Sequence, residues 1–178
     1  MADRSGSRRR PRRKGAATSD GQRRQLARAS RHAATPVAAP AAGEWTRVLC
    51  DGGSRGNPGP AAVAAVLVAP DGAVLDRRAA PIGRATAAEA EYRAILLGLE
   101  LAASRGADPL ELRSDSLLAI EALQRRSPAD AGLAALVREI HASSSRFKAV
   151  TWRWHSAREN ELADALVRDL LWRRGAGA

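Results

Sequence analysis

Four acidic residues stand beside or within apolar segments of this sequence. They are Asp51, Glu91, Asp115 and Asp164. An ionised carboxylate in a half-apolar setting is costly unless it is paired or binds a cation. Mg²⁺ takes oxygen ligands and keeps water positions open for a phosphate, so carboxylates that converge from separate elements could hold hard cations. The first hypothesis is therefore a metal site built from carboxylates.

Each of these acids also has an ordinary structural explanation. Asp115 precedes a helical pattern and could cap it, while Glu91 and Asp164 could lie on solvated helix faces. Asp51 opens the segment DGGSRGNPGP, in which glycine and proline are typical of a turn. Only the joint arrangement of the four acids favours the metal-site hypothesis, so the elements that place them matter.

Short apolar runs predict strands on both sides of the glycine-rich segment. The expected strands cover residues 45–50, 61–69 and 73–80. Pro70, Asp71 and Gly72 supply hairpin turn chemistry between the last two, which predicts an antiparallel meander. In this interpretation Asp51 ends the first strand.

Helical spacing of apolar residues dominates the rest of the chain. The expected helices are 86–106, a second beginning near Asp115, 129–143 and 159–174, with strands at 109–112 and 147–154. The resulting order, βββαβααβα, predicts an α/β domain.

These motifs, in this order, resemble the ribonuclease H type 1 family over about residues 45–173. DGGSRGNPGP is similar to the first-strand motif of that family, TAAEAEYRAILLGLE to its first helix, SDSLLAI to its Asp-Ser helix start, and RENELADAL to its final helix. The resemblance implies a ribonuclease H-like mixed five-stranded sheet flanked by helices. The short run from Asp115 to Phe147 resembles the branch without a basic protrusion, found in bacteria and archaea.

The resemblance also implies an activity and its ligands. The implied catalytic metal ligands are Asp51, Glu91, Asp115 and Asp164, holding two Mg²⁺ ions, with Mn²⁺ as the alternative. Two metals about 4 Å apart hydrolyse a phosphodiester by activating water and stabilising the leaving 3′ oxygen. The implied substrate is the RNA strand of an RNA–DNA hybrid, cut internally to leave 5′-phosphate and 3′-hydroxyl ends. His155, in the loop before the last acid, is a candidate proton shuttle, with a solvated loop histidine as the alternative.

Six residues are candidates for nucleic-acid contacts. They are Gly52, Gly53, Arg55, Asn57, Thr86 and Arg158. Glycines at 52, 56 and 59 would let the protein backbone approach a nucleic-acid strand closely. By resemblance, Asn57 would form a hydrogen bond with that nucleic-acid strand and Thr86 would contact a phosphate of the DNA. Thr86 is also a suitable helix N-cap. The two arginines are candidate phosphate contacts.

This chain has fewer polar residues that could distinguish RNA from other substrates than the family often has. Ala87, Ala88 and Leu117 stand where the family often has polar residues, so side-chain contacts to sugars are reduced. Double-stranded RNA is therefore an alternative substrate. A second alternative is a binding module without catalysis, in which basic residues supply the affinity.

Most of the excess positive charge lies at the N terminus. The 178-residue chain has a net charge of +10, and residues 1–43 hold eleven Lys and Arg but only two acids. This segment also lacks aromatic residues, which predicts a disordered basic arm that attracts phosphate or merely aids solubility. The expected organisation is arm 1–43, catalytic domain 44–174 and flexible C terminus 175–178.

Long apolar runs, the single cysteine and the tryptophans give the remaining expectations. No apolar run approaches the length of a membrane span or a secretory signal, so we expect a soluble, cytoplasmic, bacterial-type monomer that meets the nucleoid through its substrate, with no membrane partner. The single cysteine, Cys50, is expected to be buried. The tryptophans at 45, 152, 154 and 172 are expected to pack in the core and against the sheet, with base-stacking platforms as the alternative.

Overall fold

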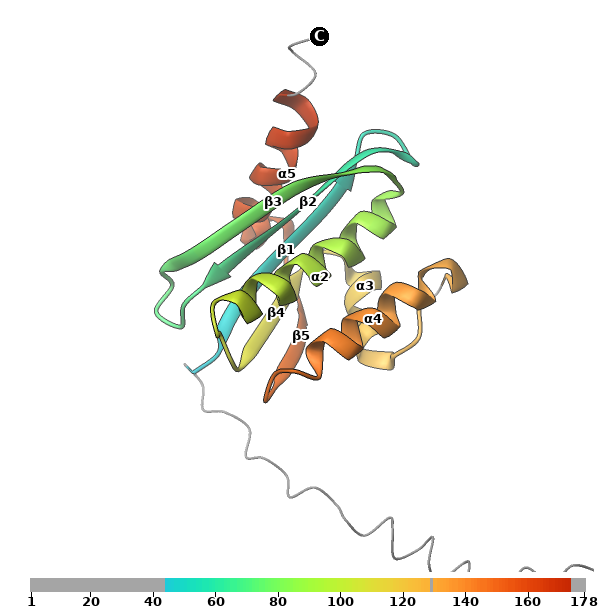
Figure 1. Cartoon of the computed structure of the whole chain (residues 1–178). Helices are drawn as coiled ribbons and strands as arrows, with labels where there is room; N and C mark the ends of the chain where they lie inside the picture. Colours follow the sequence, from blue (N-terminus) through green and yellow to red (C-terminus); the bar gives the residue numbers. More distant parts are fainter. Residues whose placement is uncertain (1–43, 129, 174–178) are drawn as a thin grey trace, which may run out of the picture. The chain divides into compact units, whose positions relative to one another are not determined.

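The computed structural model describes residues 44–128 and 130–173, all within the compact unit Ala39–Ala178 (Figure 1). The predicted arm, 1–43, and C-terminal segment, 175–178, lie outside the described residues. The strands are β1 (Thr46–Ser54), β2 (Gly59–Val68), β3 (Val74–Ala85), β4 (Leu110–Ser114) and β5 (Val150–Trp154). The α-helices are α2 (Ala87–Ser104), α3 (Leu117–Arg125), α4 (Ala134–Ser144) and α5 (Glu161–Arg173), and the short 3₁₀ turns are η1 (Ala131–Leu133) and η2 (Ala157–Asn160).

The five strands form one mixed sheet in the order β3-β2-β1-β4-β5. The pairs β1–β2 and β2–β3 are antiparallel, as the predicted meander requires, whereas β4 and β5 join the other side of β1 in parallel. The predicted α/β class, element order and mixed five-stranded sheet are confirmed. None of the helices in the described ranges is both long and apolar enough to cross a membrane.

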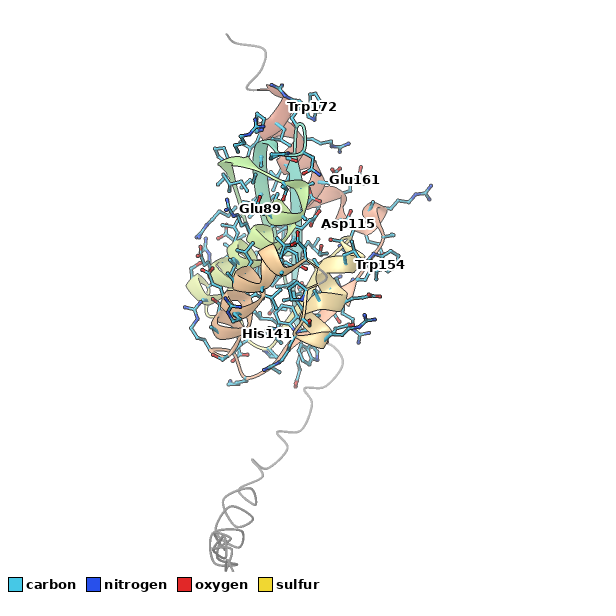
Figure 2. All side chains as sticks on the ribbon, turned by 90° about the vertical axis from the view of Figure 1, so that its right-hand side faces the viewer. Glu89, Asp115, His141, Trp154, Glu161 and Trp172 are labelled. Carbon is cyan, nitrogen blue, oxygen red and sulfur yellow. The ribbon has the colours of Figure 1, made fainter. Side chains whose placement is uncertain are left out.

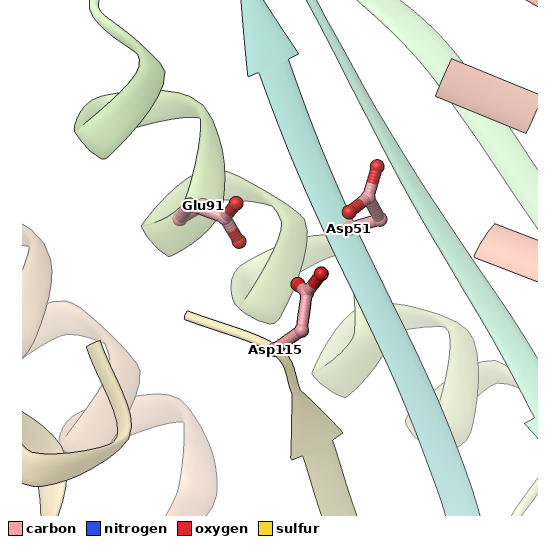
Figure 3. A group of neighbouring side chains, drawn as sticks. All are labelled: Asp51, Glu91 and Asp115. Carbon is pink, nitrogen blue, oxygen red and sulfur yellow. The ribbon is translucent and has the colours of Figure 1, made fainter. Parts of the chain in front are cut away.

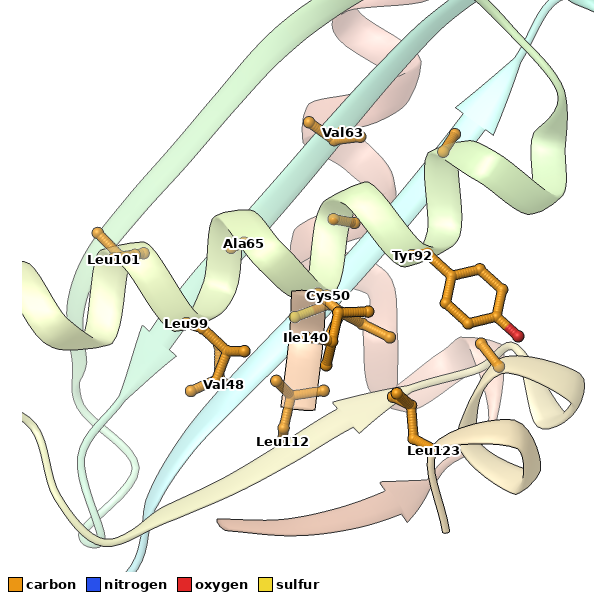
Figure 4. Close-up of a cluster of buried hydrophobic side chains, with 14 of the residues drawn as sticks. Val48, Cys50, Val63, Ala65, Tyr92, Leu99, Leu101, Leu112, Leu123 and Ile140 are labelled. Atoms are coloured by element: carbon orange, nitrogen blue, oxygen red, sulfur yellow. The ribbon is translucent and has the colours of Figure 1, made fainter. Parts of the chain in front are cut away.

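Helices cover both faces of the sheet (Figure 1). Side chains alternate along β1, so Val48 and Cys50 enter the core on the α2 side while Leu49 enters the core on the α5 side. Figure 4 shows part of the α2-side core, where Leu112 and Ile140 are fully buried. Cys50 is fully buried too, as predicted, and burial raises the pKa of its thiol.

The end of the first strand was predicted wrongly. β1 continues past residue 50 to Ser54, and Asp51 pairs with Ala64 inside the strand rather than at its end. Helix packing explains why a glycine is needed within this strand. A Cβ at position 52 would lie 2.2 Å from the Ala90 carbonyl carbon of α2, which is too close for any other residue. The glycine that suggested a turn instead lets α2 lie directly on the strand.

A substitution at Gly52 tests this close packing. We expect Gly52→Ala to destabilise the fold by several kcal/mol, since its Cβ would meet rigid backbone of α2 rather than movable side chains. Gly53→Ala is the matched control, because its Cβ would lie 3.2 Å from the Val167 Cγ1 atom, at the end of a side chain. Urea unfolding should show the larger loss at Gly52, and equal losses would contradict this account.

Candidate metal centre

Three of the four predicted acids meet at the middle of the sheet (Figure 3). One oxygen from each of Asp51, Glu91 and Asp115 lies within 4.8 Å of the other two. Asp51 is only 7% exposed, and the other two side chains are half-buried. Carboxylates at this spacing repel one another unless protons or cations separate them.

The fold explains why these acids meet. β4 pairs with β1 only as far as Ser114 opposite Cys50, so Asp115 leaves β4 beside Asp51 on the neighbouring strand. Glu91 comes from α2, which lies against β1 at Gly52. The short β4 and the glycine in β1 therefore create the gap that the three carboxylates share.

The environment favours the protonated form of two of these acids when no cation is bound. Burial, then the charges of Asp115 and Asp164, raise the pKa of Asp51 to about 7. Burial, then Asp51 and Asp115, raise the pKa of Glu91 to about 9, and a hydrogen bond from Ser114 opposes this shift. A half-buried set of oxygen donors in mutual repulsion is the chemistry that suits a hard divalent cation. The residues present therefore fit a metal site.

The fourth acid, Asp164, lies beside this group rather than within it. It is on the first turn of α5, and its Oδ2 atom is 3.0 Å from an Arg168 guanidinium nitrogen. Its charge still raises the pKa of Asp51, so it is close enough to act on the centre. The structure thus brings three acids together and places the fourth on an adjacent element, paired with an arginine.

Asn160 is a site residue that the sequence interpretation did not identify. Its side chain is fully buried, and its Nδ2 atom donates to the Cys50 carbonyl at 2.9 Å. The same nitrogen lies 3.4 Å from Asp51 Oδ1 and 3.3 Å from Asp115 Oδ1. The available signal was its place in RENELADAL, four residues before Asp164.

His155 is buried, so the interpretation as a solvated loop histidine is wrong. The side chain is 4% exposed at the end of β5, and its backbone N–H donates to the Ser114 carbonyl. Burial and the charge of Arg113 lower the pKa of its imidazole. Both ring nitrogens are buried and have no hydrogen-bond partner among the described residues.

The predicted nucleic-acid contacts surround the glycine-rich segment and the start of α2. Thr86 is the N-cap of α2, where its hydroxyl accepts from the Glu89 backbone N–H and the Glu89 carboxylate accepts from the Thr86 N–H. Asn57 Oδ1 accepts from the Ala87 N–H at 3.1 Å, so it ties the loop after β1 to the same helix end. The cap interpretation of Thr86 is confirmed.

The glycines and arginines have other immediate neighbours. A Cβ at Gly52 would face α2 and a Cβ at Gly53 would face α5, so a ligand could contact only the backbone atoms of these two glycines. The Arg55 guanidinium lies 5.7 Å from the ring centre of Trp172, and Arg158 is exposed in η2.

A mixed sheet in this strand order, with carboxylates gathered where its first and fourth strands part, defines the ribonuclease H-like class. The family described as "Reverse transcriptase-like" matches residues 49–170. A protein of Halobacterium salinarum named "Ribonuclease HI" is 50% identical over 84 residues, which are 47% of this chain and 42% of that protein. This chain belongs to the ribonuclease H type 1 family.

Solved structures agree with this assignment. The RNase H1 of the halophilic archaeon Halobacterium salinarum is 38% identical with a TM-score of 0.67, covering 70% of this chain and 95% of that structure. LC11-RNase H1 in complex with an RNA/DNA hybrid is 27% identical with a TM-score of 0.68, covering 74% of this chain and 99% of that structure. The described domain therefore corresponds to nearly the whole of each solved domain, although the chain spans less than half the length of the curated relatives it matches.

Proposed function

We propose that this protein is a metal-dependent endoribonuclease that hydrolyses the RNA strand of RNA–DNA hybrids. The observation that carries the proposal is the convergence of Asp51, Glu91 and Asp115 within 4.8 Å. It is supported by a relative named for this activity and by a similar RNase H1 solved in complex with an RNA/DNA hybrid. The catalytic domain would comprise residues 44–174.

Each acid would have a defined part in the site. Asp51, Glu91 and Asp115 would hold the divalent cations through their converging carboxylate oxygens, and Asp164, on the neighbouring helix, would complete the set of ligands. When bound, Mg²⁺ or Mn²⁺ would supply charge to activate water and stabilise the leaving 3′ oxygen, which accounts for 5′-phosphate and 3′-hydroxyl products. The ion pair between Asp164 Oδ2 and Arg168 would compete with a cation for this carboxylate.

The proposed substrate contacts follow the path of β1 out of the site. β4 ends opposite Cys50, so the backbone of Gly52 and Gly53 has no sheet partner on that side within the described strands. Those peptide groups can meet the 2′-hydroxyls that distinguish RNA from DNA in the wide minor groove. Asn57 would hydrogen-bond the same nucleic-acid strand, Thr86 would contact a phosphate of the DNA, and the exposed Arg55 and Arg158 would contact phosphates.

The proposal is tested by cleavage of labelled substrates. An RNA–DNA hybrid, double-stranded RNA, double-stranded DNA and single-stranded RNA would each be incubated with Mg²⁺, Mn²⁺ or EDTA. We expect cutting of the hybrid that requires metal. Equal cutting of double-stranded RNA would broaden the substrate, and tight binding without cutting under every metal would favour a non-catalytic binding module.

The basic arm should affect affinity rather than chemistry. Residues 1–43 carry eleven cationic side chains, so we expect their deletion to raise the KM for hybrid and flatten its dependence on salt, with kcat nearly unchanged. Hydrolysis rates across a range of KCl concentrations measure both effects. A large loss of kcat at saturating hybrid would contradict this role.

The cellular setting follows from the proposed substrate. A monomer acting on hybrids in a bacterial-type cytoplasm would meet the nucleoid through those hybrids. Size-exclusion chromatography with light scattering would test the monomeric state directly.

A further inference from the structure

The orientation of the Asn160 amide helps to set the geometry of the carboxylate group. Its single nitrogen faces three acceptors, the Cys50 carbonyl and one oxygen each from Asp51 and Asp115. An amide nitrogen carries two hydrogens, so these acceptors share two donors. Rotation of the amide would therefore release both carboxylates at once.

The opposite end of the same amide is buried without a partner. Asn160 Oδ1 accepts no hydrogen bond, and neither ring nitrogen of His155 has a partner within the described chain. The two side chains nevertheless approach each other. Burial is the main cause that lowers the pKa of His155, and hydrogen bonding to Asn160 acts in the opposite direction. A buried donor beside a buried acceptor, neither with another partner among the described residues, has the components of a hydrogen bond.

We propose that His155 is a positioning residue whose ring N–H donates to Asn160 Oδ1. A small rotation of the imidazole would satisfy both buried groups and hold the amide nitrogen toward Asp51 and Asp115. The His155 backbone bond to Ser114 keeps the imidazole next to the end of β4. This role requires a buried ring, as observed, and differs from that of a proton shuttle. It rests on the proposed function only in taking Asp51 and Asp115 as metal ligands.

Two substitutions separate hydrogen bonding from packing. His155→Phe keeps a ring but removes the donor, and His155→Gln keeps a donor. We expect His155→Phe to weaken binding of Mn²⁺ alone by about 10–100-fold, as is usual for residues that orient metal ligands, with partial recovery in His155→Gln. In ¹H–¹⁵N spectra the Asn160 side-chain amide should shift in the Phe variant and return toward its wild-type position in the Gln variant.

These readouts do not depend on nuclease activity. If no hybrid is cut but the Asn160 signal and Mn²⁺ affinity change as expected, the proposed function fails and the positioning role stands. A folded His155→Phe variant with unchanged amide signals and Mn²⁺ affinity would overturn the positioning role. The wild-type protein offers a test without substitution. Long-range ¹H–¹⁵N spectra of the His155 imidazole should show one neutral tautomer with a slowly exchanging ring N–H. Rapid averaging between the two tautomers would overturn the positioning role.

A separate observation concerns Trp154 at the end of β5. The sequence interpretation expected it to pack, but its side chain is 53% exposed, and its indole Nε1 donates to the Asp115 carbonyl at 3.1 Å. Figure 2 labels Trp154 and Asp115 on the same side of the domain. On the chain directly after Asp115, Leu117 and Leu118 are also exposed. An indole fixed by its edge next to a proposed metal ligand therefore presents ring surface to solvent.

We infer that Trp154 is a substrate contact on which a base or ribose of the bound strand packs. Continuity with the carboxylate group argues for this occupant, because a strand held at Asp115 must pass beside the indole. Aromatic stacking accepts every base, so the contact would add affinity without sequence preference. The inference deepens the proposed function, and binding in EDTA tests it even if the protein cuts nothing.

The test compares variants that keep or remove the ring. Trp154→Ala should weaken hybrid binding in EDTA by about 5–100-fold, the range expected for loss of one stacked base, whereas Trp154→Phe should bind nearly as well as wild type. Hybrid should quench tryptophan fluorescence in the wild type and in Trp172→Phe, which alters another exposed tryptophan near the end of α5, but not in Trp154→Phe. Unchanged affinity of Trp154→Ala, or quenching that persists in Trp154→Phe, would overturn the inference.

Discussion

Replacing Asp115 by Asn should reduce hydrolysis of the hybrid by about 10³-fold or more at saturating Mg²⁺. Loss of one ligand weakens the electrostatic stabilisation supplied by the cations, which is worth several kcal/mol, and each 1.36 kcal/mol corresponds to about a tenfold change in rate. The carboxamide occupies nearly the same volume, so folding should be retained. Single-turnover cleavage with hybrid in excess of its Kd measures the chemical step.

The control for this variant is Asp71→Asn, which makes the same chemical change in the turn between β2 and β3. Asp71 accepts from the nearby Ala73 N–H and is exposed, so its replacement should leave the rate unchanged. Binding of hybrid in EDTA should be equal or tighter in Asp115→Asn, because one negative charge facing phosphate is removed. An Asp115→Asn enzyme that retains more than about a tenth of wild-type activity would contradict the metal-ligand role, since a loss of only about 1.36 kcal/mol would already reduce the rate tenfold.

The element order and three of the metal-centre residues could be predicted because they depend on local patterns. Strand and helix periodicities report which side of each element is buried, and acids that interrupt those patterns are conspicuous. Asp51, Glu91 and Asp115 were found in this way, and the structure brings them together. Asp164 was found by the same reasoning, and the structure pairs it with Arg168 one turn along α5, beside the group rather than within it.

What could not be predicted depends on contacts between distant segments. The glycines after Asp51 suggest a turn, and only the approach of α2 shows that β1 needs them to continue to Ser54. Asn160 lies more than a hundred residues from the Cys50 carbonyl that it binds, so its role depends on how η2 folds against β1. The burial of His155 and exposure of Trp154, neighbours on the chain, are likewise set by packing at the end of β5.

Glu91→Gln should stabilise the metal-free protein at alkaline pH, the opposite of its expected effect on activity. The pKa of Glu91 is raised from 4.5 to about 9, so the native state binds more protons than the unfolded state between those values. Wild-type stability must therefore fall as pH rises through this window. A glutamine carries no charge to desolvate, so at pH 8.5 in EDTA we expect a gain on the order of a few kcal/mol, about 5–15 °C in Tm.

The pH and metal dependence of this gain identify its cause. Near pH 4.5 the wild-type carboxyl is protonated, so the advantage of Glu91→Gln should disappear there. Divalent cations bind the native wild type through the same carboxylates and should raise its Tm, and that rise should be smaller in the variant. Thermal melts at pH 4.5 and 8.5, in EDTA and in Mg²⁺, give all four comparisons.

Glu89 provides a control of opposite sign two residues earlier on α2. Hydrogen bonds from the Thr86 backbone and hydroxyl lower the pKa of Glu89, so its charged form favours folding above its unfolded pKa, and that contribution is lost as pH falls through the folded pKa. Glu89→Gln should therefore give no stabilisation at pH 8.5. If Glu91→Gln raised the Tm equally at both pH values, the gain would come from packing rather than from relief of repulsion. A pH-dependent gain that Mg²⁺ reverses would show that the protein sacrifices stability to keep three carboxylates together, which is the cost expected of a site kept for binding cations.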